Sequence, residues 1–187
     1  MATKVKLQGV RLSFPKLFEA EAFPGTDTKR YGARFLIPKG SDLEKAINAA
    51  VQSEAQAKYG KTWQRTLASI EGNSNKFCWL DGDKVGKYES EEGHMLLSSA
   101  RKESDGRPIV LDRNKTPLQA KDGKPYAGCY VNATVEIWAQ DGQYTGMRCT
   151  LLGVQFDRDG DSFGGAGKAS DDDFDDLGVP EGSDELV

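Results

Sequence analysis

The chain has 187 residues, of which 37% are hydrophobic and 29% are charged, as is typical of a single soluble globular domain. No apolar run approaches the roughly 20 residues that span a bilayer, and the N-terminus lacks the apolar stretch of a signal peptide. We therefore expect a cytosolic protein without membrane contact. The cysteines, Cys78, Cys129 and Cys149, form no CxxC pair, which predicts buried and reduced thiols.

The net charge of -4 averages two very different parts of the chain. Residues 161–187 contain nine acids and one base, a net charge of -8, which leaves +4 on residues 1–160. A block of like charge repels itself and stays solvated, and such blocks are often interaction tails. We predict a basic body over residues 1–160, and a Gly-rich hinge with a disordered acidic tail over residues 161–187.

Two strands are predicted at the start of the body. Apolar and polar residues nearly alternate over residues 4–14, with a break at Gly9 that suggests a β-bulge. Pro15 is expected to end this strand. After a loop at residues 23–28, strict alternation predicts a second strand over residues 30–37.

Residues 41–59 carry the clearest helix signal. Ser41 is a suitable N-cap, and Glu44 three residues later completes a capping box. Gly60 supplies a C-terminal stop. Residues 62–70 suggest a second, shorter helix.

From residue 75 onward, short apolar segments alternate with five Asp-Gly turn signals. Several short strands joined by regular turns indicate a mainly β sandwich or barrel. The Asp141-Gly142 pair is expected to fold one long strand onto the next as a hairpin. The predicted strands are residues 76–80, 95–100, 108–111, 129–139 and 144–156.

The chain offers few groups for catalysis. His94 is the single histidine, so neither a zinc triad nor a histidine pair can form within one chain. Gly60-Lys61-Thr62 resembles the end of a phosphate-binding loop, but it follows a helix instead of preceding one. Asp81 and Asp83 could hold a metal ion, although the tip of a hairpin is the favoured interpretation. We predict no enzyme, no cofactor and no metal.

Binding of single-stranded DNA needs no catalysis, only cations along a groove and flat rings on which bases stack. The body contains both residue types interleaved. For each aromatic residue a place in the core is the alternative, and Phe77 and Trp79 would share a face. For each lysine the alternative is a solvated surface position. The candidate DNA-binding residues are Arg30, Tyr31, Arg34, Lys76, Trp79, Lys84, Lys87, Tyr88, Arg101, Lys102, Arg107, Tyr126 and Tyr130.

Five segments occur here in the same order as in a known family. They are RLSFPKLFE at 11–19, YGARFLIPK at 31–39, LDGD at 80–83, YAGCYVNA at 126–133 and GVQF at 153–156. The chain thereby resembles a family of phage-encoded single-stranded-DNA-binding proteins, similar to the replication single-strand binders of short-tailed coliphages.

The resemblance implies an OB-fold, a five-stranded barrel with an inserted helix and additional hairpins. It also implies a non-enzymatic role in phage replication or recombination, in the cytoplasm of the infected bacterial host. The acidic tail would bind replication partners and compete with DNA for the basic groove. The tail residues in question are Asp171, Asp172, Asp173, Phe174, Asp175 and Asp176.

Four possibilities stay open at this point. Weak duplex binding and a homodimer are both compatible with the sequence. The main rival function is a phage protein that inhibits a host DNA-processing protein through acids that mimic DNA. A metal-dependent nuclease that uses Asp81 and Asp83 is a weaker rival.

Overall fold

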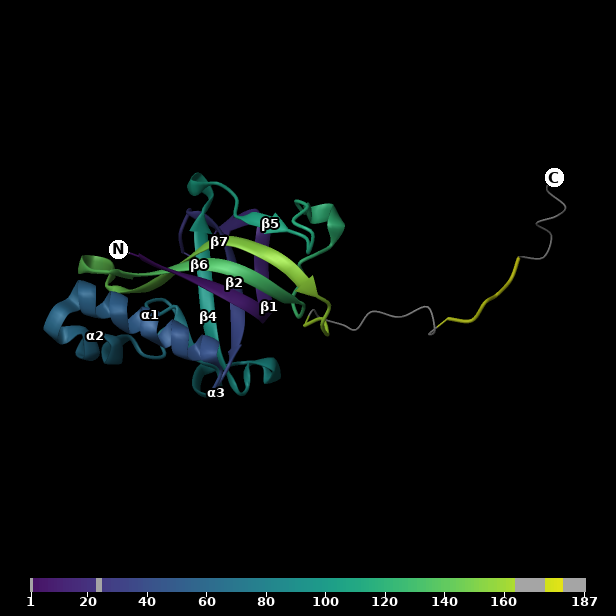
Figure 1. The fold of residues 1–187 in the computed structure, drawn as a ribbon. Helices are drawn as coiled ribbons and strands as arrows, with labels where there is room; N and C mark the ends of the chain where they lie inside the picture. Colours follow the sequence, from purple (N-terminus) through teal and green to yellow (C-terminus); the bar gives the residue numbers. More distant parts are fainter. Residues whose placement is uncertain (1, 23–24, 164–173, 180–187) are drawn as a thin grey trace.

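The computed structural model describes residues 2–22, 25–163 and 174–179. The two longest helices lie together on one side of a strand-rich body (Figure 1). Within the described ranges, no helix is long and apolar enough to cross a membrane. The elements are β1 (Ala2–Ala22), β2 (Lys29–Pro38), α1 (Asp42–Tyr59), α2 (Trp63–Ile70), β3 (Trp79–Asp81), α3 (Gly82–Val85), β4 (His94–Lys102), β5 (Ile109–Leu111), β6 (Tyr130–Gln140) and β7 (Gly146–Arg158).

Five strands close into a barrel. The sheet order is β3-β4-β2-β1-β6-β7-β5, and a parallel pairing of Ala100 in β4 with Thr150 in β7 closes the ring. The short strands β3 and β5 extend the sheet beside β4 and β7. Closure removes the free edges that an open sheet would expose. The predicted mainly β, OB-type five-stranded barrel is confirmed.

Strand β1 is longer than predicted, and its pairings with β6 and β2 shift register at three places. The pairing of β1 with β6 shifts between Leu7 and Val10, around Gly9 at φ 61°, which confirms the predicted bulge. The prediction that Pro15 ends the strand is wrong, since β1 continues to Ala22. A second register shift against β2 lies between Ser13 and Lys16. A proline is tolerated at such a bulge, where its missing N–H leaves no ladder hydrogen bond unmade.

Helix α1 begins at the predicted N-cap, Ser41, but the predicted capping box is only half formed, because the Glu44 carboxylate accepts from the Gly40 N–H instead of the Ser41 N–H. Ser41 Oγ accepts a hydrogen bond from the Glu44 backbone N–H at 3.2 Å. The helix packs on β1 and β6, and two hydrogen bonds in its C-terminal third fix it to these strands. Thr3 donates to Glu54 at 2.6 Å, and the Tyr59 hydroxyl donates to the Gln140 carbonyl at 2.6 Å. The predicted second helix is α2, which packs against α1.

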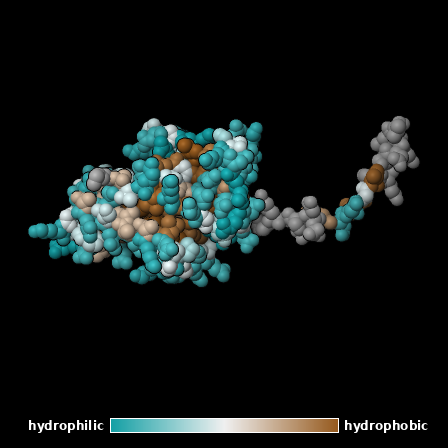
Figure 2. Space-filling model, viewed as in Figure 1, coloured by the Kyte–Doolittle hydropathy of each residue, from teal (hydrophilic) through white to brown (hydrophobic). Residues whose placement is uncertain are grey.

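The core fills the barrel interior and the contact with α1. Side chains of β6 alternate along the strand between buried and half-buried, as its sequence pattern predicted. Polar surface covers most of the face seen in Figure 2, and apolar atoms gather in a band over the barrel strands. Fully buried core residues include Leu7, Leu12, Phe35, Ile37, Ile47, Leu97, Val131, Ile137 and Leu151.

The Asp-Gly pairs do not all make hairpins. Asp141-Gly142 joins β6 to β7 in the predicted hairpin. Asp81, in contrast, caps α3 by accepting from the Asp83 N–H at 2.9 Å, so the predicted hairpin tip is corrected. The turn at Asp105-Gly106 joins β4 and β5, which pair in parallel with β7 instead of with each other. An Asp side chain that favours a turn can equally cap a helix, which explains why Asp81 caps α3 instead of forming a hairpin tip.

The three cysteines are buried, and they give a first testable prediction. Burial raises the pKa of Cys78 to about 12, and it also raises the pKa values of Cys129 and Cys149. Because the thiolate is the reactive form, we expect no fast reaction of the native protein with a disulfide reagent at about pH 8. All three thiols should react once the protein is unfolded in guanidinium chloride. Rapid stoichiometric labelling of the folded protein would contradict this packing.

Candidate nucleic-acid interface

Two exposed aromatic rings meet on the outside of the barrel. Phe14 of β1 is 49% exposed and Tyr88, in the segment between α3 and β4, is 53% exposed. Their ring centroids are 5.6 Å apart, and the planes are tilted by 52°. The rings therefore do not stack face to face on each other. Each keeps open surface, which a nucleobase needs in order to stack.

The backbone of Phe14 explains why this ring points outward. Its φ of 48° lies in the left-handed region, within the second irregularity of β1. A bulky residue seldom adopts this conformation, which costs about 1–3 kcal/mol and is often found at functional sites. The neighbouring Leu12 and Leu17 are buried. The bulge thus turns one aromatic side chain to solvent between two core residues.

Arg34 of β2 completes this cluster. It lies opposite Ser13 of β1 and Ser98 of β4, and its guanidinium carbon is 5.5 Å from the centre of the Phe14 ring. Arg34 Nε donates to Ser98 Oγ at 3.2 Å, and Nη1 forms an ion pair with Glu91 at 3.0 Å. The fold thereby brings together two predicted site residues, Arg34 and Tyr88, that are far apart in sequence. We call Phe14, Arg34 and Tyr88 the aromatic platform.

A second group of rings and cations lies further along the outer face of β1. Arg11 pairs with Tyr130 of β6, and its guanidinium lies 4.2 Å from the centre of the Phe163 ring. The Arg158 guanidinium lies 4.1 Å from the centre of the Tyr130 ring. Tyr130 is half-buried, so part of its surface is already covered by the protein itself.

The segment after β7 packs on this second group. Arg11 donates to the Asp161 carbonyl at 2.7 Å, and the Phe163 N–H donates to the Ala127 carbonyl at 3.0 Å. The Tyr126 hydroxyl donates to Asp159 at 2.7 Å. A Cβ on Gly128 would lie 2.0 Å from the Asp161 carbonyl oxygen, so glycine is required where the backbones meet. Contacts of the body thus extend to Phe163, beyond the predicted limit at residue 160.

Two predicted stacking residues lie in the core instead. Trp79 of β3 is only 5% exposed, and its Nε1 donates to Asn48 of α1 at 2.7 Å. Tyr31 of β2 is buried on the side of the strand that carries Ala33 and Phe35. Neither ring is open to a base, so the alternative of a core position holds for both and we leave them out of the interface. Alternation of residues shows which side chains share a face but not which face is inside.

The remaining predicted cations lie on other elements. Arg101 donates to the carbonyls of Asp105 and Gly106, both at 2.7 Å, and so braces the turn after β4. Lys84 of α3 is 3.8 Å from Glu71. Lys87 is exposed next to Tyr88. Arg30 and Lys102 are cross-strand neighbours at the ends of β2 and β4, Arg107 lies over the Phe18 ring, and Lys76 precedes β3.

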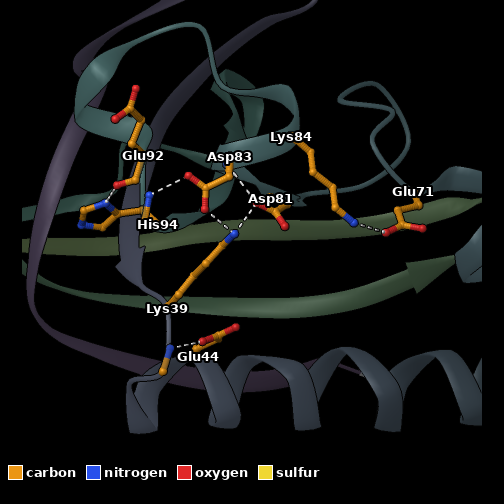
Figure 3. A network of polar contacts seen from close by, with 10 residues as sticks. Lys39, Glu44, Glu71, Asp81, Asp83, Lys84, Glu92 and His94 are labelled. Carbon is orange, nitrogen blue, oxygen red and sulfur yellow. Dashed lines mark hydrogen bonds and ion pairs between the residues drawn. The ribbon is translucent and has the colours of Figure 1, made fainter.

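The carboxylates of Asp81 and Asp83 face a lysine (Figure 3). Lys39 Nζ lies 2.6 Å from an oxygen of each carboxylate. These hydrogen bonds raise the pKa of Lys39 and lower the pKa values of Asp81 and Asp83. An ammonium thus lies where a metal ion would have to bind. In the described ranges, no group of three or more His, Cys, Asp or Glu residues could hold a metal.

Comparison with known proteins identifies the family. The family model described as Enterobacter phage Enc34, ssDNA-binding protein, matches residues 3–186. The chain belongs to this family. Protein p50 of Acyrthosiphon pisum secondary endosymbiont phage 1 is 46% identical over 180 residues, which cover 95% of this chain and 96% of p50. The resemblance that the ordered motifs predicted is confirmed.

Solved structures agree on the fold. The single-stranded DNA-binding protein from bacteriophage Enc34 in complex with ssDNA matches with a TM-score of 0.71 at 22% identity, over 86% of this chain and 89% of that one. The gp2.5 single-stranded DNA binding protein encoded by bacteriophage T7 matches with a TM-score of 0.56 at 11% identity, over 96% and 99% of the chains. At these identities the matches show a shared fold.

Sequence reasoning did not single out Phe14, Arg11 or Phe163. One signal for Phe14 was present, because Phe14-Pro15 interrupts an otherwise alternating strand that resumes afterwards. A proline inside a continuing strand marks a bulge, and bulges redirect side chains. Arg11 and Phe163 lie too far apart in sequence for a local pattern to pair them.

Proposed function

We propose that the protein binds single-stranded DNA with little sequence preference along the outer face of β1 and β2. Bases stack on Phe14 and Tyr88, and Arg34 supplies positive charge beside them. The observation that carries this proposal is the exposed pair of tilted rings next to an arginine. Membership of a family described as ssDNA-binding, and a similar fold solved with ssDNA, support it.

The chemistry of the platform suits a ligand without fixed sequence. Every base has a flat face, so stacking on an aromatic ring contributes about 1–3 kcal/mol per base whatever the base is. A duplex hides these faces between its stacked pairs, so the platform favours single strands. Arg11 lies two residues from Ser13, the partner of Arg34, on the same side of β1, and it can continue the positive path.

We extend the proposal to the biological role and to the tail. The protein acts without catalysis or cofactor in phage DNA replication or recombination, and its acidic tail docks partner proteins and competes with DNA. Asp171, Asp172 and Asp173 lie outside the described residues. In the described part of the tail, Phe174 is 72% exposed and Leu177 is exposed as well. Apolar side chains among acids are a typical docking motif for a partner with a basic groove.

A titration with labelled oligo-dT at several salt concentrations tests the function. With about three to four phosphate contacts, Kd should rise roughly 20- to 50-fold between about 50 and about 200 mM NaCl. A duplex of the same length should bind much more weakly at every concentration. An inhibitor that mimics DNA would show no binding to oligo-dT even at low salt, and equal affinity for duplex would also contradict the proposal.

A further inference from the structure

A buried carboxylate lies directly behind the aromatic platform. The Glu91 side chain is only 2% exposed. A carboxylate neither stacks on a base nor binds a phosphate, so Glu91 has no direct role in holding DNA. Burial of a carboxylate costs several kcal/mol unless charged and polar partners replace its water. Such a residue in a DNA-binding protein calls for a physical reason, because a negative charge repels phosphates.

The partners of Glu91 are two of the elements that build the platform. One carboxylate oxygen, Oε2, accepts from Arg34 Nη1 of β2 at 3.0 Å. The other, Oε1, accepts from the backbone N–H groups of Lys87 and Tyr88 at 3.0 and 3.1 Å. The Glu91 N–H in turn donates to the Tyr88 carbonyl at 3.0 Å. One side chain thus joins the guanidinium over Phe14 to the turn that carries the Tyr88 ring.

The surrounding backbone is built closely around this residue. A Cβ on Gly82 would lie 2.2 Å from the Glu91 carbonyl oxygen, and a Cβ on Gly86 would lie 3.1 Å from the Glu91 Cβ. The glycines at the two ends of α3 therefore let the segment 82–91 fold over Glu91. The packing leaves the carboxylate little freedom to choose other partners.

We propose that Glu91 is the positioning residue of the single-strand site. It holds the Arg34 guanidinium over Phe14 and fixes the Tyr88 turn, so that both rings and the cation are arranged before DNA arrives. The inference rests on the proposed function. Preorganisation of this kind increases affinity because ordering costs are not incurred on binding.

Replacement of Glu91 is expected to change DNA affinity in the opposite direction to replacement of an ordinary surface acid. Removal of an acid from a DNA-binding surface normally strengthens binding, because one repulsive charge is lost. For Glu91→Gln we expect the opposite, a roughly fivefold weaker affinity for oligo-dT, since an amide has one acceptor oxygen instead of two and carries no charge to hold Arg34. Glu91→Ala also frees the Lys87 and Tyr88 amides, and it should weaken binding roughly 20-fold.

Glu89→Gln is the matched control, because Glu89 is an exposed acid on the same turn. This variant removes the same charge without touching the platform, so its affinity should equal or slightly exceed that of the unchanged protein. A second measurement needs no DNA. Exchange of the Lys87 and Tyr88 amide hydrogens, followed by NMR, should accelerate in Glu91→Ala while amides of β6 stay protected.

A mutant cycle in which Arg34 and Tyr88 are replaced together separates a positioning role of Glu91 from general destabilisation of the protein. If Glu91 acts through the platform, Glu91→Gln should cost little further affinity in a Tyr88→Ala, Arg34→Ala background. Full additivity, or affinity of Glu91→Gln equal to that of Glu89→Gln, overturns the positioning role. Should Phe14→Ala and Tyr88→Ala themselves bind DNA normally, the platform itself is refuted, which is a different result from failure of Glu91 alone.

Discussion

Replacement of both Phe14 and Tyr88 by alanine is expected to weaken binding to oligo-dT by roughly 100-fold, because two stacking contacts of about 1.4 kcal/mol each are lost. Either single substitution should cost about tenfold. The measurement is fluorescence anisotropy with a labelled oligonucleotide at low salt, with urea unfolding to show that each variant keeps its stability. Both rings are exposed, so their truncation leaves the core intact.

Tyr144 provides the matched control for this experiment. It is as exposed as Tyr88 but lies in the hairpin between β6 and β7, at the other end of β6 from Tyr130. Tyr144→Ala should therefore retain the affinity of the unchanged protein. If Tyr144→Ala weakens binding as much as the platform variants do, exposed aromatic residues contribute to DNA binding wherever they lie, and the site is not localised at the platform. Unchanged affinity of the folded double variant would refute the platform.

Deletion of residues 168–187 is expected to strengthen DNA binding roughly tenfold at low salt, about 1.4 kcal/mol, and to have little effect at high salt. The deleted segment contains eight acids and one base, so the polyanion that we propose as a competitor for the basic surface is removed. The measurement is the same titration on full-length and truncated protein over a range of NaCl concentrations.

Two further variants show which part of the tail competes. In the first, Asp171, Asp172, Asp173, Asp175 and Asp176 become asparagine, which keeps the length and Phe174. In the second, Phe174→Ala keeps every charge. Competition by charge predicts that the first variant resembles the truncated protein and the second resembles the full-length one. Unchanged or weaker DNA binding after truncation would rule out tail competition.

The strands and the main helix were predictable because their signals are local. Alternation in β2 and β6 marks one apolar face, and the Ser41 N-cap marks where α1 begins. Closure of the barrel could not be predicted from the sequence pattern of any single strand. It depends on the contact of β4 with β7, whose residues are distant in the chain. The resemblance in motif order supplied that information.

The site was predictable only in part, for a similar reason. Arg34 and Tyr88 were candidates, but their meeting depends on the β2–β4 pairing and on the turn held by Glu91. Phe14 ends the near-alternation of residues 4–14, directly before a proline. Its outward direction goes with a left-handed backbone at the register shift between β1 and β2, which no local pattern shows. Trp79 had the residue type of a stacking platform, and only the packing of β3 under α1 shows that it is buried.

Phe163 is anchored against Arg11 of β1. The tail leaves the body from the outer face of β1, the same strand that carries Phe14. Under the proposed competition, an encounter of the tail with that face is intramolecular, and a short linkage of this kind corresponds to an effective concentration on the order of millimolar. Dilution of the protein should not relieve the competition, and a free peptide with the tail sequence should reproduce it only at comparable millimolar concentrations.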